Sequence, residues 1–339
     1  MTSALLPGAP VEVAGAPNIP GLSFRRYRDG DVRALAALQG AVEIADATYE
    51  ILGEVALANE LANLADFEPS RDLLLAEVDG RLVAASRQVR MIRDDEREFS
   101  TSGWVHPDWR RRGLGRAMLR FAEAQLRDRA AAEEAAGETR AAHLGSWTFD
   151  QAAGAVALLE SEGYRPVRWF FEMVRPLDEA MPDRRLPDGI ELRPVTDDLA
   201  RAVLAADAEA FQDHWGAHET TEEDVRRMLG DPDNDLSLWI AAWAGDDVVG
   251  SVINRIYPTD NAASGIRRGW LDRVSVRRPW RRIGVASALI VASLRELRER
   301  DVEIAALGVD SDNPTGALGV YERLGFRPDK RSAAYRKPL

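Results

Sequence analysis

The chain has 339 residues, no cysteine, and 44 basic against 56 acidic side chains, which gives a formal net charge of −12. At roughly 100–200 residues per domain, this length predicts two domains. The lack of cysteine excludes disulfides, thiolate zinc sites and a cysteine nucleophile within this sequence. The negative charge argues against nucleic acid as a partner, because nucleic-acid binding needs a positive field over the phosphates.

The first 20 residues carry no signal for targeting or for membrane insertion. They lack a basic region, and four prolines interrupt any helix. We therefore expect a flexible leader over residues 1–20. No stretch approaches the roughly 18 apolar residues of a membrane-spanning helix. A cytoplasmic protein without a membrane partner is the resulting expectation.

Four short segments recur in the same order and at a nearly constant interval along the chain. The pairs are residues 21–26 with 189–194, 110–115 with 281–286, 163–166 with 325–328, and 175–177 with 337–339. Such an interval is far too long for a solenoid and indicates two copies of one domain. We predict an N-terminal domain over 21–177, a linker over 178–188 and a C-terminal domain over 189–339.

Each copy shows the same succession of predicted elements. In the first copy these are strand 22–27, helix 31–44, a helix near 49–64, strands 73–78, 82–91 and 99–106, helix 114–132, strand 140–148, helix 152–162 and a final strand. In the second copy they are strand 190–195, helix 197–211, a helix near 222–229, strands 238–244, 248–256 and 268–276, helix 285–300, strand 303–310, helix 314–324 and a final strand. Asp79-Gly80 and Gly245-Asp246 predict tight hairpin turns. The fold class is therefore α/β, with two tandem domains, each a mixed sheet flanked by about four helices.

A glycine-containing loop lies between a strand and a helix in both copies. We call residues 110–116 the first glycine loop and residues 281–287 the second glycine loop. Small residues allow close backbone approach, and the helix that follows offers unpaired N–H groups and a positive dipole end, which suits a pyrophosphate. The predicted cofactor-binding residues are Arg110, Arg111, Arg112, Gly113, Gly115 and Arg116 in the first loop, and Arg281, Arg282, Ile283, Gly284, Val285, Ala286 and Ser287 in the second. A glycine turn with solvated arginines remains the alternative.

The second copy carries a longer spaced pattern, which is made up of Val274, Val276, Arg281, Gly284, Ala286, Asn313, Ala317, Tyr321, Gly325 and Phe326. At these residues it resembles the GCN5-related N-acetyltransferase (GNAT) superfamily. The resemblance covers nearly all of both copies and implies a mostly antiparallel GNAT sheet in each. In its tandem arrangement the chain is similar to GNAT proteins such as mycothiol synthase.

The resemblance implies acetyl-CoA as cosubstrate and assigns roles to the matching residues. The second glycine loop would bind the CoA pyrophosphate, and the strand edge at Val274 and Val276 would bind the pantetheine arm. Asn313 would fix the pantetheine or the gap between strands. Tyr321 would protonate the departing thiolate. The alternative for Tyr321 is an aromatic side chain that covers the core.

The first copy departs from the family pattern. Gln151, Ala155 and Leu159 stand where the second copy has Asn313, Ala317 and Tyr321. Leucine cannot donate a proton. We therefore expect the chemistry in the C-terminal domain, with the N-terminal domain as a non-catalytic acyl-CoA binder or a scaffold.

A carboxylate is expected to assist deprotonation of the acceptor amine. Asp272 is the first candidate, with a salt bridge to Arg268 or Arg273 as its alternative role. Asp310 and Asp312, at the end of a predicted strand, are rivals.

The acceptor contacts are expected from a loop rich in aromatic and polar residues and from nearby strand ends. The predicted substrate residues are His214, Trp215, His218, Tyr257, Trp270 and Asp310. An ordinary surface turn is the alternative for the loop. We expect no metal, because Gly216 separates His214 from His218 and no third ligand is evident.

Together these features predict an acetyl-CoA-dependent N-acetyltransferase that acts on a primary amine of a small molecule. Transfer would be direct, because no cysteine can carry the acyl group. The alternatives are a CoA-binding regulator without turnover and an enzyme like mycothiol synthase, which acetylates the amine of a cysteinyl pseudodisaccharide. We expect a monomer with an internal pseudo-dimer, or a weak homodimer.

Overall fold

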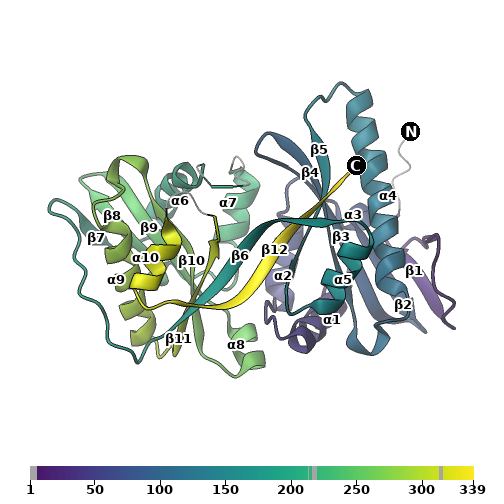
Figure 1. Cartoon of the computed structure of the whole chain (residues 1–339), viewed down its shortest axis with the longest axis horizontal. Coiled ribbons are helices and arrows are strands. Elements are labelled where there is room, and N and C mark those ends of the chain that lie inside the picture. Colours follow the sequence, from purple (N-terminus) through teal and green to yellow (C-terminus); the bar gives the residue numbers. More distant parts are fainter. Residues whose placement is uncertain (1–5, 213, 216–219, 313–315) are drawn as a thin grey trace. The chain divides into compact units, whose positions relative to one another are not determined.

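The computed structural model describes residues 6–212, 214–215, 220–312 and 316–339. The chain forms two compact units, whose elements are labelled in Figure 1. Unit 1 consists of Met1–Val167 and Ala333–Leu339, and unit 2 of Arg168–Ser332. Each is a mixed α/β structure, which confirms the predicted fold class. Among the described helices, none is long and apolar enough to cross a membrane.

The sheet of unit 1 is antiparallel from β1 to β4, and β5 then joins β4 in parallel. Its strands are β1 (Leu22–Arg26), β2 (Leu73–Val78), β3 (Arg81–Arg93), β4 (Glu96–Val105) and β5 (Ala142–Phe149). The predicted turn between β2 and β3 has positive φ at Asp79 (49°) and Gly80 (79°), as a type I′ turn requires. Pairing of β4 with β5 ends at Ser100↔Gly145, although both strands continue.

Helices cover both faces of this sheet. Successive residues of a strand point to opposite faces, and consecutive residues of β2 are apolar, so both faces present apolar side chains. Leu74 and Ala76 pack with α4 (Leu114–Ala135), whereas Leu73 and Leu75 pack with α1 (Val32–Asp46) and α2 (Glu54–Ala62) on the other face. The short helix α3 (Pro69–Asp72), which the sequence did not predict, precedes β2, and α5 (Ala153–Ser161) follows β5.

Residues 6–20, which we call the N-terminal segment, lie along β1. The Val11 N–H donates to the Phe24 carbonyl, and the Arg26 N–H donates to the Ala9 carbonyl, each at 2.9 Å. The side chain of Val13 is only 8% exposed, since it packs into the core cluster of α4. The prediction of a flexible leader does not fit residues 9–13, because Ala9 and Val11 are hydrogen-bonded to the β1 backbone and Val13 is buried.

The sheet of unit 2 repeats the arrangement with β6–β11–β10–β9–β8–β7 as its strand order. The strands are β6 (Arg165–Pro176), β7 (Glu191–Arg193), β8 (Ile240–Ala244), β9 (Asp247–Ile256), β10 (Arg268–Val276) and β11 (Ile304–Asp310). Only β10 and β11 pair in parallel among these, and their register runs from Arg268↔Ile304 to Trp270↔Ala306. The predicted strand positions are thus reproduced closely.

Two layers of helices cover the unit 2 sheet. Ala242 and Val252 face α9 (Val285–Glu299) and α10 (Ala317–Arg323). Their chain neighbours Trp243 and Ile253 face α6 (Asp197–Phe211) and α7 (Glu222–Leu229). A further helix, α8 (Pro258–Ser264), follows β9 and was not predicted.

The last strand of each repeat contributes to the unit that the other repeat mainly forms. Residues of β6 pair with β11 from Phe170 to Pro176, and the buried Glu172 accepts hydrogen bonds from Arg268 and Lys330 at 3.1 and 3.2 Å. The end of β12 (Arg327–Pro338) belongs to unit 1, where Lys337 Nζ lies 2.8 Å from the Glu123 carboxylate. The structural units therefore differ from the predicted domains 21–177 and 189–339.

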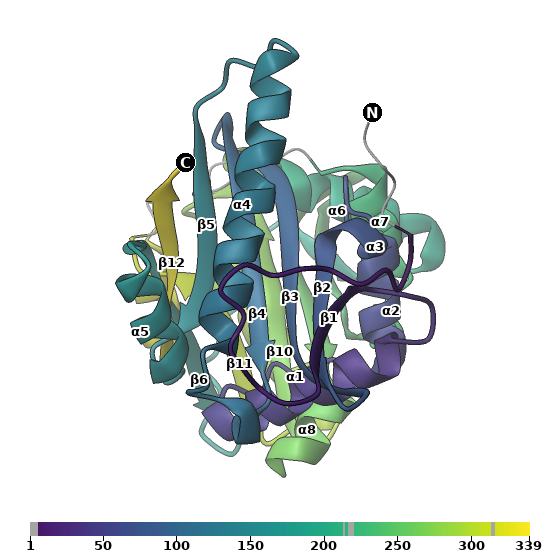
Figure 2. The same cartoon turned by 90° about the vertical axis from the view of Figure 1, so that its right-hand side faces the viewer.

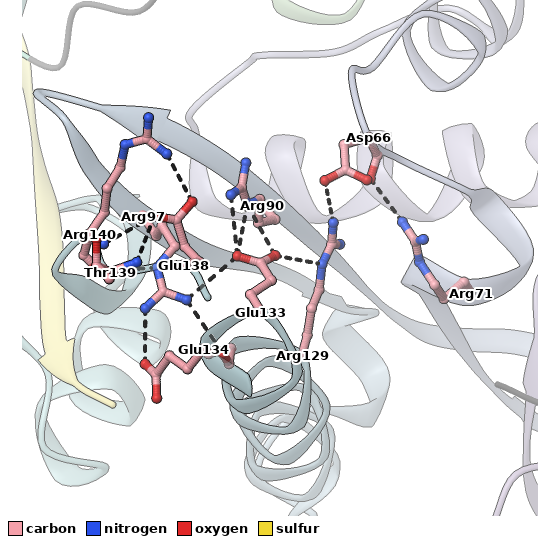
Figure 3. Close-up of polar contacts among 11 residues, drawn as sticks. Asp66, Arg71, Arg90, Arg97, Arg129, Glu133, Glu134, Glu138, Thr139 and Arg140 are labelled. Carbon is pink, nitrogen blue, oxygen red and sulfur yellow. Dashed lines mark hydrogen bonds and ion pairs between the residues drawn. The ribbon is translucent and has the colours of Figure 1, made fainter. Parts of the chain in front are cut away.

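The C-terminal turns of α4 continue past the strand ends (Figure 2) and are attached to the sheet by ion pairs. The Arg97 side chain of β4 is 2% exposed and donates to the Glu134 carboxylate at 2.9 Å and to the Ala130 carbonyl at 3.4 Å. Glu133 lies within 4 Å of the guanidinium groups of both Arg97 and Arg90 (Figure 3). Arg97 thus links β4 to the last turns of α4 through one helix carbonyl and two carboxylates.

Replacing Arg97 by leucine should lower the free energy of unfolding by about 2 kcal/mol or more, because the Glu133 and Glu134 carboxylates lose their buried cation and β4 loses its link to the end of α4. Urea denaturation followed by circular dichroism measures this change. The matched control is Arg93→Leu on β3, whose ion pair with Glu98 is long and partly exposed. It should cost less than about 1 kcal/mol. Equal losses for the two variants would contradict the role of Arg97.

Candidate active site

The two glycine loops have the same backbone conformation. Residues with positive φ are Arg111 (62°) and Gly113 (90°) in the first loop and Arg282 (68°) and Gly284 (96°) in the second. Left-handed residues next to right-handed ones turn successive N–H groups to one side, and the first amides of the following helix lack intrahelical acceptors. Both loops therefore offer backbone donors to an anion such as a diphosphate.

The first arginine of each loop fastens the loop to the preceding strand. Arg110 Nε donates to the Val105 carbonyl at 3.2 Å, and Arg281 Nε donates to the Val276 carbonyl at 2.9 Å. The Arg110 guanidinium also forms two hydrogen bonds with Asp46, at 2.7 and 2.8 Å. These contacts give both side chains a structural role, so the backbone amides are the main donors to an anion.

The other predicted residues of the loops differ between the units. Arg112 lies over the Trp109 ring at 4.6 Å, and Arg116 pairs with Glu162 at 2.8 Å. In the second loop the side chains of Arg282 and Ile283 are exposed. Val285 is buried in the core, while Ala286 and Ser287 begin α9 and are half-buried.

Strands β10 and β11 diverge directly beside the second glycine loop. Their pairing ends at Trp270↔Ala306, yet β10 stays paired with β9 up to Val276, and β11 stays paired with β6 up to Asp310. The predicted strand edge at Val274 therefore faces a gap and has no ladder partner on that side. An extended chain can add to such an edge through main-chain hydrogen bonds.

A β-bulge places Asp272 at the start of this gap. The register of β10 with β9 shifts between Leu271 and Arg273, which leaves Asp272 as the extra residue. Its carboxylate lies 3.5 Å from Arg255 Nε, and its side chain is 37% exposed. Surrounding protein atoms raise the pKa of the Asp272 carboxyl, and the charges of Arg255 and Arg273 oppose this effect only in part. The alternative of a salt bridge to Arg268 is wrong, because Arg268 pairs with Glu172.

Three further groups gather around the buried Arg255. Its guanidinium forms an ion pair with Asp231 in addition to the contact with Asp272. Burial, and then the negative charge of Asp272, raise the pKa of the Tyr257 hydroxyl, which therefore stays protonated. Trp270 stands opposite Arg255 in the ladder, and its ring lies 5.7 Å from the Arg268 guanidinium. Of the predicted site residues, Asp272 and Tyr257 thus lie beside Arg255, and Trp270 lies next to it on the neighbouring strand.

Tyr321 approaches the sheet from the opposite face. It lies on α10, is 7% exposed, and its ring centroid is 6.0 Å from that of Phe326. It belongs to the core cluster under α9, whereas Arg255 contacts the α7 side. Burial raises the pKa of Tyr321 to about 12, so its hydroxyl keeps its proton at physiological pH. Asn313 lies outside the described residues.

The predicted acceptor loop joins an aromatic group at the end of α6. The rings of Phe211 and His214 stack at 4.4 Å, and the Arg273 guanidinium lies 4.2 Å from the Phe211 ring. Burial, followed by the charges of Arg273 and Arg281, lowers the pKa of His214, so its imidazole is neutral near pH 7. Trp215 lies 6.0 Å from Phe170. His218 lies outside the described residues.

Asp310 forms an ion pair with Arg168, a residue that the sequence analysis did not predict for this site. Arg168 donates to both carboxylate oxygens of Asp310, at 2.8 and 2.7 Å, and also to the Asp312 carbonyl. Its guanidinium lies 5.7 Å from the Trp215 ring. Both carboxylate oxygens of Asp310 are thus held by one guanidinium, whereas Asp272 has a single, longer ion-pair contact among the described residues. Arg168 comes from the last strand of the first repeat, and no local sequence pattern links it to this site.

Asp207 is a second residue that sequence reasoning missed. It lies on α6 among the buried residues Val203, Leu204 and Ala210, and it pairs with Arg273. Burial raises the pKa of its carboxyl, and the pairing with Arg273 opposes the shift. The sequence did offer a signal for it, since Asp207 lies within the apolar stripe of a predicted helix. A carboxylate in such a position is rarely buried without a partner, so it indicates a buried ion pair.

At the two matching positions, the described part of unit 1 carries neither an acid nor a base. Leu159 is buried on α5 at the position that Tyr321 occupies on α10. Thr101 stands where the second repeat has Asp272, and its carbonyl accepts a hydrogen bond from Ser146 at 3.0 Å across the diverging strands. Neither side chain can serve as the acid or the base.

Both halves of the chain match one enzyme family. Residues 69–166 match the acetyltransferase (GNAT) domain, and residues 200–326 match the acetyltransferase (GNAT) family. A mycothiol acetyltransferase of Thermomonospora curvata is 32% identical over 238 residues, which cover 69% of this chain and 72% of that protein. The chain belongs to the GNAT family.

The likeness extends over nearly the whole chain. A mycothiol acetyltransferase of Geodermatophilus obscurus is 29% identical over 320 residues, which cover 92% of this chain and 96% of that protein. A GNAT crystal structure from Sphaerobacter thermophilus is 27% identical, with a TM-score of 0.68 and coverage of 94% and 95%. A tandem GNAT protein from the clavulanic acid pathway shares the fold at 18% identity, with a TM-score of 0.66 and coverage of 94% and 98%. The predicted tandem GNAT arrangement and an acetyl-transferring enzyme that uses acyl-CoA are thus confirmed.

Proposed function

We propose that unit 2 transfers an acetyl group from acetyl-CoA directly to a primary amine of a small molecule. The observation that carries this proposal is the divergence of β10 from β11 beside the second glycine loop. The loop amides would bind the pyrophosphate, and the free edge of β10 would bind the pantetheine arm. The thioester would then lie between the strands, where Asp272 and Tyr321 approach from opposite faces.

Each proposed catalytic residue has one defined task. Asp272 accepts a proton from the ammonium group of the acceptor, directly or through water, and the free amine attacks the thioester carbonyl. The N–H near Val274 donates to the oxygen that becomes negative in this step. As the amide forms and the C–S bond breaks, the Tyr321 hydroxyl gives its proton to the leaving thiolate.

The relatives favour one acceptor as the first to test. One relative named mycothiol acetyltransferase is 29% identical across 92% of this chain. This favours the acceptor that the resemblance to mycothiol synthase implies, the amine of a cysteinyl pseudodisaccharide. A panel of this compound, amino acids, polyamines and amino sugars would be assayed by mass spectrometry for release of CoA and for the acetylated amine. Mass spectrometry is needed because the cysteinyl compound carries a thiol of its own that would react in a thiol assay. Release of CoA that depends on the amine supports an N-acetyltransferase. Binding of acetyl-CoA without release of CoA for any amine supports a CoA-binding regulator without turnover.

Replacing Tyr321 by phenylalanine should lower kcat by roughly 10²–10⁴-fold, because the thiolate loses its acid while the packed ring remains. The dissociation constant for acetyl-CoA should not change. Steady-state kinetics and calorimetry give the two values. Tyr27→Phe in unit 1 is the matched control and should retain full activity. Full activity of the Tyr321 variant would refute the assignment.

Replacing Asp272 by asparagine should remove the acidic limb of the pH profile of kcat/KM. Since the pKa of Asp272 is raised, the wild-type rate should increase with pH through a value above that of an ordinary aspartate and then level off. Asp310→Asn provides the control, because Arg168 already binds that carboxylate, and it should retain the limb. An unchanged limb in the Asp272 variant would exclude Asp272 as the base.

A further inference from the structure

The N-terminal segment reaches the first glycine loop. A Cβ atom added to Gly113 would be in ordinary van der Waals contact with Pro17, at 3.5 Å from its Cβ and 3.9 Å from its Cγ, so the proline ring covers this glycine at the distance of one methyl group. Val11 and Ile19 pack against the cluster that contains Leu114, the first residue of α4. Figure 2 shows the segment in dark purple as it passes over α4 before it enters β1.

The second glycine loop differs at the equivalent position. Gly284 has nearly the same φ as Gly113, yet a Cβ atom added there would meet no described atom within 4 Å. The segment that precedes the second repeat packs instead on the core cluster through Met181 and Leu186. The two glycine loops thus have the same backbone conformation, but among the described residues only the first is covered by another segment of the chain at its αL glycine.

Two more features of unit 1 disfavour an anion at its loop. A Cβ atom added to Gly115 would lie 3.3 Å from Leu158 Cδ2, so an apolar side chain of α5 is packed against the loop. The positive charge of Arg116 is paired with Glu162, which also pairs with Arg120 at 2.8 Å. Glu162 therefore offsets the cations that would attract a diphosphate.

We propose that the N-terminal segment is a built-in occupant of the first glycine loop, so that each chain binds one molecule of acyl-CoA, in unit 2. This inference uses the acyl-CoA cosubstrate but not the proposed acceptor or catalytic residues. The segment is covalently attached and anchored along β1, so it competes as an intramolecular ligand at high effective concentration. Proline suits the contact, since its ring fills space on Gly113 without adding an N–H group.

The test is the stoichiometry of CoA binding by isothermal titration calorimetry. The intact chain should bind one equivalent. Gly284→Ala should abolish this binding, whereas Gly113→Ala should leave it unchanged. The two variants are matched, because alanine is similarly strained at φ 90° and 96°. A chain without residues 1–18 should gain a second, weaker binding event, which Gly113→Ala removes.

A second measurement uses the intact chain, in case truncation impairs folding. In hydrogen exchange with and without CoA, amides of residues 281–287 should gain protection, while those of residues 110–116 should not. Two equivalents bound by the intact chain, CoA protection of residues 110–116, or a folded truncated chain that still binds one equivalent would each overturn the inference. Failure of every variant to bind CoA would instead refute the cosubstrate on which both proposals depend.

Discussion

The candidate site depends on the short parallel pairing of β10 with β11. Each of these strands has a longer pairing on its other side. β10 stays paired with β9 up to Val276, and β11 stays paired with β6 up to Asp310. The twist of adjacent strands and the bulge at Asp272 then separate the two. A sheet normally leaves no free backbone groups in its interior. This gap provides them, next to a helix start that offers further N–H donors.

Much of this arrangement could be predicted from the sequence because it follows from local patterns. The repeat, the hairpin turns at Asp79 and Gly245, and the apolar stripes fixed the order of elements and both glycine loops. The family motif added Tyr321 and the strand edge at Val274. These features depend on residues close together in the chain, where spacing reports geometry directly.

The remaining features depend on tertiary contacts, which local spacing does not encode. Arg168 reaches Asp310 because β6 pairs with β11, a relation between distant segments. The bulge at Asp272 changes the register of one strand without any glycine or proline to mark it. The prolines of the N-terminal segment exclude a helix and so predict a flexible leader, but they do not exclude an extended chain along an edge strand.

The way in which β6 and β12 are divided between the units has a consequence for synthesis on the ribosome. Unit 2 is continuous from Arg168 to Ser332, whereas unit 1 also needs Ala333–Leu339. Domains usually fold in the order in which they emerge. Here the unit that begins first is completed last, so its sheet must wait with an unpaired edge while the other unit is translated. A ribosome that stops after Ser332 would release a finished unit 2 beside an incomplete partner.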